Sequence, residues 1–201
     1  MLICHFISLR PDISADPVKY FLAIATPSSI AQQIEDFRSP WGSAKTAPHI
    51  TVKAPNSLGE PKNWLPQVNE LCRQVAPFDV ILAGVGRFNA TALYLRVASA
   101  ELVDLHQALL RITTPPPAEQ AEYFEGIHYL PHLTLAHTES GITTEALAAM
   151  LPLAQERWAH PTRFVAETVI AYQSVGAGQP YTQYQIVPFS GPGSSLAQAQ
   201  L

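Results

Sequence analysis

The sequence predicts an α+β fold in which pairs of antiparallel strands alternate with helices. Two observations predict this class. Segments with the period-two alternation of strands occur in neighbouring pairs between segments of helical periodicity. In addition, the order of a helix, a strand that begins with Pro-His, another helix and two strands occurs twice along the chain. This repeated order indicates an internal duplication whose residue identities have diverged.

In the first half of the chain, each expected element follows from a local pattern. The apolar run 20–25 ends at Thr26-Pro27, which is typical of a buried strand, and Ser28 or Ser29 can cap the helix that follows. Alternation after Pro48 predicts the next strand, and two apolar segments around a turn at 86–89 predict a strand pair. The expected elements are a strand over 20–25, a helix over 28–38, a strand over 49–54, a helix over 61–76, and strands over 78–85 and 92–97.

The second half is predicted in the same way. Leucines at helical spacing predict a helix that the run Pro115-Pro116-Pro117 must end. Thr143 or Thr144 can cap a later helix, in which Pro152 is expected to cause a kink or a break. The expected elements are a helix over 100–112, a strand over 129–137, a helix over 143–158, and strands over 164–174 and 181–189 around a glycine-rich turn. We expect one domain over residues 1–189 and a disordered tail over 190–201.

The composition limits the class of protein and its partners. The chain has 201 residues, of which 47% are hydrophobic and 14% are charged, as in a globular domain. The net charge is −4, and the sequence contains no cluster of Lys and Arg, whereas proteins that bind long nucleic acids carry a basic surface. We therefore expect a small substrate or a nucleic-acid end, and no binding of duplex DNA.

The sequence also predicts a cytoplasmic location. No apolar run reaches the roughly 18 residues that a membrane span needs, and the first residues have no basic leader, so neither a membrane anchor nor a signal peptide is expected. The two cysteines, Cys4 and Cys72, lie far apart in the sequence. Reduced thiols in a cytoplasmic protein are the simplest interpretation.

A pentad that occurs twice is the most informative feature. The two copies are Pro48-His49-Ile50-Thr51-Val52 and Pro131-His132-Leu133-Thr134-Leu135. On a strand, residues i and i+2 point to the same side, so each His shares a face with its Thr while the aliphatic residues face a core. Proline is tolerated at the first residue of a strand, which places each His where its strand begins. Since the copies occupy equivalent places in the repeated order, we expect them to form one site.

These residue types suit the cleavage of a phosphodiester. Transfer of the phosphoryl group to water needs a base for the nucleophile and an acid for the leaving oxygen, and His can be either because its unperturbed pKa is about 6.5. Threonine hydroxyls can donate to the non-bridging phosphate oxygens. We predict that His49, Thr51, His132 and Thr134 form a catalytic unit that requires no metal or cofactor. The alternative is that the histidines are structural residues at strand ends and that Thr occurs there for its strand propensity.

The paired His-x-Thr strands resemble the 2H phosphoesterase superfamily, which includes the 2′-5′ RNA ligase and cyclic phosphodiesterase proteins. The resemblance covers residues 18 to 189 and extends to the closing hairpin around Ile170–Ser174 and Tyr181. It implies a bilobal α+β fold, with two antiparallel sheets flanked by helices and related by pseudo-two-fold symmetry around a central cleft. It also implies hydrolysis of 2′,3′-cyclic phosphates, in which His49 protonates the leaving 3′ oxygen, His132 activates water, and both threonines hold the phosphate. The substrate would be a small cyclic nucleotide or an RNA 3′ end.

The sequence departs from this family after the second motif. Many members carry a basic residue there, whereas this chain has Ala136-His137. We therefore expect weaker binding of the phosphate at the second motif. Lys53 shares the face of His49 by alternation and is a candidate source of positive charge for the substrate. A solvated lysine at a strand end is an equally good interpretation. Tyr181 is a further candidate for substrate contact.

Other residues give weaker signals. Tyr129 and the pair Tyr123-Phe124 precede His132 and are candidates to stack a base, although core packing is the more common fate of aromatic residues. Trp41, in the loop before His49, is a candidate of the same kind. His128, His132 and His137 are not expected to bind zinc, because Pro131 opposes the helix that the spacing of His128 and His132 would need. Pro180 likewise favours a hairpin turn over a phosphate loop at Gly176–Gly178.

Three functions remain open from the sequence. The first is metal-independent hydrolysis of a 2′,3′-cyclic phosphate. The second is ligation of RNA ends to form a 2′-5′ bond, which is chemically the reverse reaction. The third is a non-catalytic nucleotide- or RNA-binding protein that retains the fold. The presence of both His and both Thr favours an enzyme, because binding alone would not require two groups that transfer protons.

Overall fold

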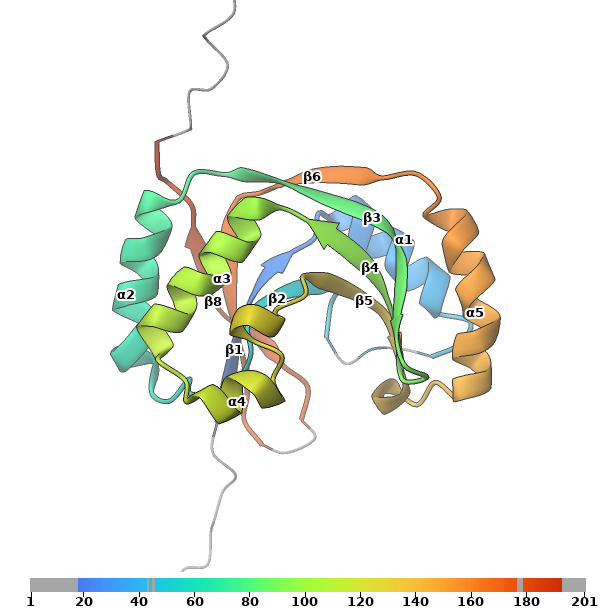
Figure 1. The fold of residues 1–201 in the computed structure, drawn as a ribbon, viewed down its shortest axis with the longest axis horizontal. Helices are drawn as coiled ribbons and strands as arrows, with labels where there is room; N and C mark the ends of the chain where they lie inside the picture. The colour runs from blue at the N-terminus through green and yellow to red at the C-terminus, as the bar shows by residue number, and fades with distance from the viewer. Residues whose placement is uncertain (1–17, 43, 45, 177–178, 193–201) are drawn as a thin grey trace, which may run out of the picture.

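Two four-stranded antiparallel sheets form the framework of the protein, as the paired strands of the sequence predict. The structure is a computed structural model and describes residues 18–42, 44, 46–176 and 179–192. Five α-helices connect the strands in this part of the chain (Figure 1). The strands are β1 (Lys19–Ala25), β2 (His49–Lys53), β3 (Phe78–Phe88), β4 (Ala92–Ala98), β5 (His132–His137), β6 (Thr162–Ala166), β7 (Thr168–Ser174) and β8 (Thr182–Pro188). The helices are α1 (Ser28–Arg38), α2 (Pro61–Gln74), α3 (Ala100–Thr113), α4 (Pro117–Glu122) and α5 (Thr144–Arg157), with 3₁₀ helices η1 (Gly126–His128) and η2 (Thr138–Ser140).

Each sheet has one of the His-x-Thr strands at its edge. The strand order is β2-β1-β7-β8 in the first sheet and β5-β4-β3-β6 in the second. The two orders correspond strand by strand, which gives the pseudo-two-fold relation implied by the family resemblance. The edge strands β2 and β5 contact each other, so the two motifs meet where the sheets adjoin.

Two helices pack against the sheet to which their preceding strand does not belong. Helix α1 follows β1 of the first sheet but contacts β5 of the second, while α3 follows β4 of the second sheet but contacts β2 of the first. Helix α2 packs beside α3, and α5 contacts β3 and β4. Figure 1 accordingly shows α2 and α3 at one end of the molecule and α1 and α5 at the other. The helices and both sheets share one hydrophobic core, which includes Ile34, Val68, Leu109 and Met150, all fully buried.

The chain changes sheets between β6 and β7. The sequence predicts one strand over 164–174, whereas the structure has two strands in different sheets. Strand β6 pairs with β3 of the second sheet, and β7 pairs with β1 of the first. Only Glu167 separates the two strands. The alternation of apolar residues cannot show this change, because both strands bury one face in the same way.

Several other boundaries differ from prediction. Strand β3 continues through Phe88, and β5 begins at His132 rather than at 129. The short helix α4 was not predicted. Pro152 lies inside α5, which is one uninterrupted helix with Thr143 as its N-cap. Helix α1 begins at Ser28, but its N-cap is Pro27 and no side chain caps it.

The first residues of the predicted disordered tail, Ser190 and Gly191, are held against the end of α2. The backbone N–H groups of Ser190 and Gly191 donate hydrogen bonds to the carbonyl oxygens of Cys72 and Val75 at the end of α2. Residues 193–201, and Cys4 at the other end of the chain, lie outside the described residues. In the described part of the chain, none of the helices has the length and apolar character needed to cross a membrane.

Candidate active site

The four motif residues lie on the same side of their strands, as their spacing predicts. In β2, Ile50 and Val52 are fully buried in the core, so His49 and Thr51 face the opposite side. In β5, Leu133 and Leu135 are buried in the same way. His132 and Thr134 therefore face away from the core, and the four polar side chains are presented where β2 and β5 meet.

Both motif histidines are oriented by the same backbone contact. Nδ1 of His49 lies 2.8 Å from the carbonyl oxygen of Ala47, and Nδ1 of His132 lies 2.8 Å from the carbonyl oxygen of Leu130. A carbonyl oxygen can only accept, so Nδ1 carries the proton in each neutral ring. The Nε2 atom of each neutral ring is therefore unprotonated and can accept a proton. In both motifs the carbonyl belongs to the residue two positions before the His, so the contact is part of the duplication.

Each histidine also packs against a pair of stacked aromatic rings. The centroid of Phe21 lies 5.0 Å from that of His49, and Phe21 stacks on Tyr172 at 4.8 Å. On the other strand, the centroid of Phe88 lies 5.0 Å from that of His132, and Phe88 stacks on Tyr94 at 4.2 Å. These rings limit the motion of the imidazoles and shield them from water on one side.

The surroundings favour the neutral form of both imidazoles. Burial lowers the pKa of His49 and of His132 below the ordinary value of 6.5, and the hydrogen bond to the backbone carbonyl opposes this effect in part. The charge of His132, and then that of Arg38, lowers the pKa of His49 further. Since each charged ring disfavours the charging of the other, a state with one proton shared between two sites is favoured over a doubly protonated one.

Two adjoining cavities contain the motif residues. One has a volume of about 450 Å³ and is lined by His49 and Thr134. The other has a volume of about 610 Å³ and is lined by Thr51, His132 and Thr134. Because Thr134 and His137 line both, the cavities form one cleft with a motif histidine on each side. Their combined size suits a nucleotide.

His137 enters this cleft because of a β-bulge. In the pairing of β4 with β5, Leu93 and Tyr94 are consecutive, whereas their partners Ala136 and Thr134 are separated by Leu135. The extra residue reverses the alternation beyond it, so His137 faces the cleft instead of the core. The sequence pattern assigns no function to His137. The alternation continuing from Thr134 would have placed it among the buried residues, and only the register with β4 reveals the change.

The tautomer of His137 is opposite to that of the motif histidines. Its Nδ1 accepts a hydrogen bond of 3.0 Å from the backbone N–H of Glu139. The neutral ring therefore carries its proton on Nε2 and is a donor at that atom. The carboxylate of Glu139 lies 3.9 Å from Nδ1. His137 thus adds a hydrogen-bond donor to a cleft in which the imidazoles of His49 and His132 are acceptors when neutral.

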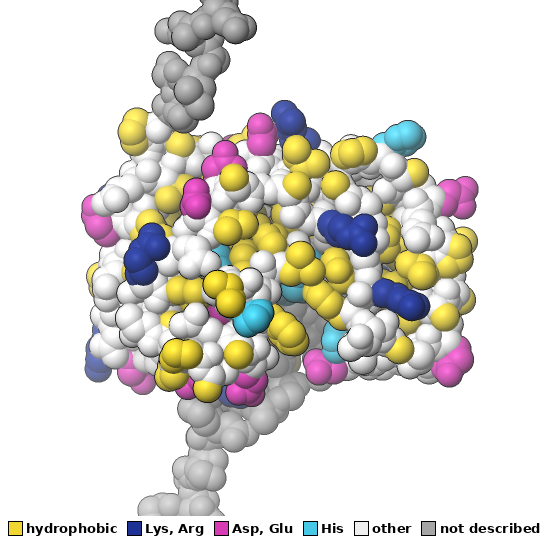
Figure 2. All heavy atoms as spheres, in the orientation of Figure 1, with side chains coloured by type: hydrophobic (Ala, Val, Ile, Leu, Met, Phe, Trp, Pro, Cys, Tyr) yellow, Lys and Arg dark blue, Asp and Glu magenta, His cyan; other side chains and the backbone are white. Residues whose placement is uncertain are grey.

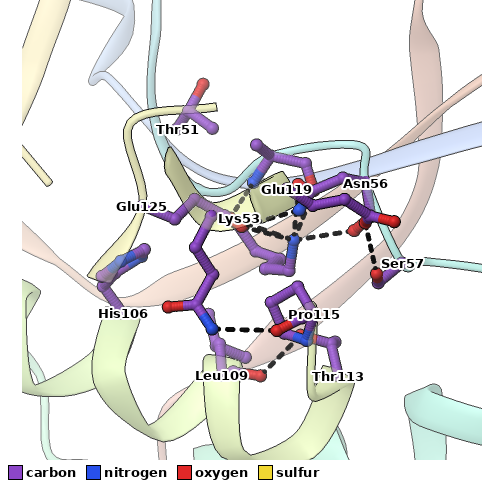
Figure 3. Close-up of polar contacts among 12 residues, drawn as sticks. Thr51, Lys53, Asn56, Ser57, His106, Leu109, Thr113, Pro115, Glu119 and Glu125 are labelled. Carbon is purple, nitrogen blue, oxygen red and sulfur yellow. Dashed lines mark hydrogen bonds and ion pairs between the residues drawn. The ribbon is translucent and has the colours of Figure 1, made fainter. Parts of the chain in front are cut away.

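Lys53 lies in a different environment from the one predicted. Its side chain is fully buried, and its ammonium donates to the carbonyl oxygens of Ala54 and Asn56, to the amide oxygen of Asn56 and to Glu125 (Figure 3). The ammonium has three N–H donors, and these four oxygen partners occupy them. Burial lowers the pKa of Lys53, while the hydrogen bond and charge of Glu125 oppose that shift. Lys53 was predicted to contact the substrate. The structure instead places its ammonium in a buried ion pair of 2.9 Å with Glu125, where it is not available to a substrate.

Side chains complete the hydrogen bonding of β2 on its free edge. Strand β1 pairs with one edge only. On the other, the hydroxyl of Tyr129 donates to the carbonyl of Thr51 at 2.7 Å, Nδ1 of His106 donates to the carbonyl of Val52 at 2.9 Å, and Glu125 accepts from the N–H of Ala54 at 3.0 Å. The predicted substrate residue Tyr129 is therefore engaged by the backbone of the first motif, and it lies stacked on His106 at 3.8 Å. The sequence around His106 carries no signal of this contact.

The remaining candidates are distributed around the cleft. Tyr181 lines the cavity of His49 and packs against Phe21. This position is compatible with the predicted contact between Tyr181 and the substrate, which stays a prediction. His128 lines the cavity of His132. Among the residues that the structure describes, no group of three or more His, Cys, Asp and Glu side chains is placed to hold a metal ion. The predicted hairpin turn at Gly176–Gly178 precedes β8 in the sequence, and its last two residues lie outside the described range.

Comparison with known proteins agrees with this arrangement. The model of the 2′-5′ RNA ligase superfamily matches residues 26–174. The chain belongs to this family. The matched range includes both His-x-Thr motifs and confirms the resemblance to the 2H phosphoesterases. A search of curated proteins finds no match.

Several solved structures share the fold of this chain. The Thermus thermophilus protein TT0787 has a TM-score of 0.59 and 17% identity, over 86% of this chain and 98% of that one. E. coli LigT complexed with NADP+ has a TM-score of 0.58 and 18% identity, over 87% of this chain and 99% of that one. E. coli LigT complexed with 3′-AMP has a TM-score of 0.56 and 18% identity, over 87% and 98% of the respective chains. At these identities the likeness shows the fold alone, and it confirms the predicted bilobal α+β architecture.

Proposed function

We propose that the protein hydrolyses a 2′,3′-cyclic phosphate, carried by a nucleotide or an RNA end, by acid–base catalysis with His49 and His132. The observation that carries this proposal is the matched presentation of the two imidazoles. Each is held through Nδ1 by a backbone carbonyl at 2.8 Å, which leaves Nε2 for proton transfer on either side of one cleft. A binding protein would not need two imidazoles in the same tautomer.

The residues divide the reaction between them. A neutral imidazole removes a proton from water as the water oxygen bonds to phosphorus, and the protonated imidazole gives its proton to the oxygen that leaves. By similarity to the family, His49 is the acid at the 3′ oxygen and His132 is the base, so the product is a 2′-phosphomonoester. The hydroxyls of Thr51 and Thr134 donate to the non-bridging oxygens, on which negative charge increases in the transition state. This scheme needs no cofactor and returns each imidazole to its first state after one proton exchange with solvent.

The ligand complexes of E. coli LigT support a nucleotide as substrate. That protein has been crystallised with 3′-AMP, with ATP and with NADP+. The cleft described above is large enough for a nucleotide. Ligation of RNA ends is the reverse of the same proton transfers and remains the second candidate, because the same two imidazoles would exchange roles.

The test is an assay in EDTA with nucleoside 2′,3′-cyclic phosphates and with short RNAs that end in a cyclic phosphate, with identification of the product isomer. We expect 2′-monophosphates, and we expect His49→Ala and His132→Ala each to lower kcat by about 10²- to 10⁴-fold. His160→Ala, at an exposed histidine outside the cleft, is the matched control and should retain full activity. Turnover that survives in both cleft variants, or that is lost in EDTA and restored by a metal, would contradict the proposed mechanism.

A further inference from the structure

The segment of residues 123–130, here called the rim segment, exposes four large apolar side chains within eight residues. Tyr123 is 39% exposed, Phe124 72%, Ile127 94% and Leu130 47%. Figure 2 shows hydrophobic side chains gathered on this face of the molecule, over α4 and the segment that follows it. Single exposed apolar residues are ordinary, but a contiguous group of this kind indicates a surface that binds a ligand or another molecule.

This group borders the candidate active site. Tyr123, Phe124 and Leu130 line the cavity of about 610 Å³ that also contains Thr51 and His132. The apolar side chains therefore continue the wall of the cleft outward from the catalytic motifs. A ligand whose phosphate lies between the motifs would place the rest of its structure against such a wall.

The rim segment is anchored from below by buried polar contacts. Glu125, which is 2% exposed, points inward to Lys53 and also accepts hydrogen bonds from Ala54 N–H and from the amide of Asn56 (Figure 3). One residue later, the N–H of Gly126 donates to Nε2 of His106 at 2.9 Å. These contacts hold the backbone in place while the neighbouring side chains remain in solvent.

The backbone of the segment is shaped to turn these side chains outward. Phe124 has φ of +54° and Gly126 has φ of +63°, with the buried Glu125 between them. A left-handed conformation costs free energy in a phenylalanine, and such strain is retained mainly at binding and catalytic sites. The segment thus combines a strained residue and a buried ion pair in order to present an exposed aromatic ring. A rigid aromatic surface binds a flat partner with little loss of conformational entropy.

We propose that the rim segment is a platform for the base of the substrate nucleotide, with Phe124 as its main stacking surface. This proposal rests on the proposed function, because it is the cleft with its two histidines that selects a nucleotide as the occupant. A nucleobase is flat and apolar on its faces, and aromatic side chains stack on every base without strong sequence preference. From the sequence, Tyr129 and the pair Tyr123-Phe124 are candidates for this role. The structure separates Tyr129 from the other two, because its ring lies on His106 and its hydroxyl donates to the Thr51 carbonyl. Of the remaining two, which both line the cavity, Phe124 is the more exposed and so has the larger surface free for a ligand.

The experiment measures binding apart from turnover. Calorimetry with adenosine 2′-monophosphate and with inorganic phosphate is carried out on the wild type and on Phe124→Ala, Phe124→Tyr and Val165→Ala. Val165 is 51% exposed on β6 and is the control for loss of an exposed apolar side chain. We expect Phe124→Ala to weaken nucleotide binding by about 5- to 100-fold, the range for loss of one base–aromatic stack, and to leave phosphate binding unchanged. Phe124→Tyr should bind as the wild type does, and so should Val165→Ala.

The outcomes separate this proposal from the proposed function. Nucleotide binding that Phe124→Ala leaves within twofold of the wild type, or a wild type that binds the nucleotide no better than phosphate, would overturn the platform. Such a result would leave hydrolysis dependent on His49 and His132 intact. Conversely, nucleotide binding that depends on Phe124 in a protein that turns over no cyclic phosphate would support the platform and contradict the hydrolase. In an active protein, Phe124→Ala should raise KM for a cyclic nucleotide and leave kcat close to its original value.

Discussion

The hydroxyl of Tyr129 donates a hydrogen bond of 2.7 Å to the carbonyl oxygen of Thr51 across 78 residues of sequence. This bond joins the strand of the first motif to the segment that leads into the strand of the second motif. It lies on the edge of β2 that pairs with no strand among the residues that the structure describes, where His106 and Glu125 bind the next backbone groups. The relative position of the two motifs therefore depends on side chains that do not belong to either motif.

Tyr129→Phe should reduce both stability and activity. The variant keeps the ring but leaves the Thr51 carbonyl without its donor, which we expect to cost about 1–2 kcal/mol in the free energy of unfolding. If Thr51 holds the phosphate, kcat should fall several-fold because its strand is less firmly placed. Urea denaturation and steady-state kinetics provide the two measurements. The control is Tyr184→Phe, at a 41% exposed tyrosine of β8, and a Tyr129 variant that behaves like this control would contradict the role given to the bond.

The buried pair of Lys53 and Glu125 should be sensitive to the loss of one partner only. Glu125→Gln leaves a buried ammonium without its counter-charge, and we expect a loss of about 3–5 kcal/mol in the free energy of unfolding. A double variant, Lys53→Met with Glu125→Leu, removes both charges and should be more stable than Glu125→Gln alone. Denaturant titrations of the wild type and these two variants test this order. Glu70→Gln, which breaks an exposed ion pair with Arg73, should leave stability unchanged.

His137 should contribute to substrate affinity rather than to proton transfer. Its Nε2–H is a donor at the wall shared by the two cavities, so His137→Ala should raise KM for a cyclic phosphate about tenfold and change kcat less. His137→Arg, which retains donors and adds a permanent charge, should lower KM below that of the alanine variant. Initial-rate kinetics over a range of substrate concentrations separate the two constants. A fall in kcat as large as that of His132→Ala would instead make His137 part of the proton transfer.

The profile of kcat/KM against pH should be a bell with its maximum below about pH 6.5. In the proposed mechanism the free enzyme is active when one imidazole is neutral and the other protonated, and kcat/KM reports the free enzyme. Burial lowers the pKa of both His49 and His132 below 6.5, so the acid loses its proton at a lower pH than an ordinary histidine would. Rates measured in buffers of constant ionic strength test this expectation. A maximum at or above pH 7 would show that the pKa of at least one of the two imidazoles is not lowered as its surroundings require.

Stability should decrease as the solution becomes acidic. Burial lowers the pKa of His106, whose Nε2 accepts a hydrogen bond from Gly126 and would lose it on protonation. The unfolded chain then binds the proton more readily, so the contribution to stability is present above pH 6.5 and is lost as the pH falls toward the lowered value. Urea titrations at several pH values give the free energy of unfolding. His106→Gln can keep one donor and one acceptor, and its stability should depend less on pH than that of the wild type.

Much of the fold could be predicted because it depends on local patterns. The alternation in 49–54 and the leucine spacing in 100–112 identified β2 and α3 closely, and the doubled pentad placed His49, Thr51, His132 and Thr134 on the correct faces. The division of 164–174 into two strands could not be predicted, since the partner strands β3 and β1 decide it. The path of the chain through α4 could not be predicted either, because it too depends on residues that are distant in sequence.

The cleft shows where local patterns are insufficient. Alternation alone assigns Lys53 to the face of His49 and therefore to the substrate. Glu125, which lies 72 residues away, pairs with Lys53 and buries it. Alternation also assigns His137 to the core, yet the register between β4 and β5 moves it into the cleft. In both cases the environment of a charged or polar side chain depends on a partner that is distant in sequence.

The two histidine motifs and their presentation at the start of two strands were determined by the sequence alone. Their physical basis is local, because the alternation of a strand decides which side chains share a face. Only the tertiary structure decided which strands adjoin, which ammonium is buried and which aromatic ring remains exposed at the rim of the cleft. Those properties arise from the register of strands and from desolvation by distant residues, and neither is encoded in the spacing of neighbours.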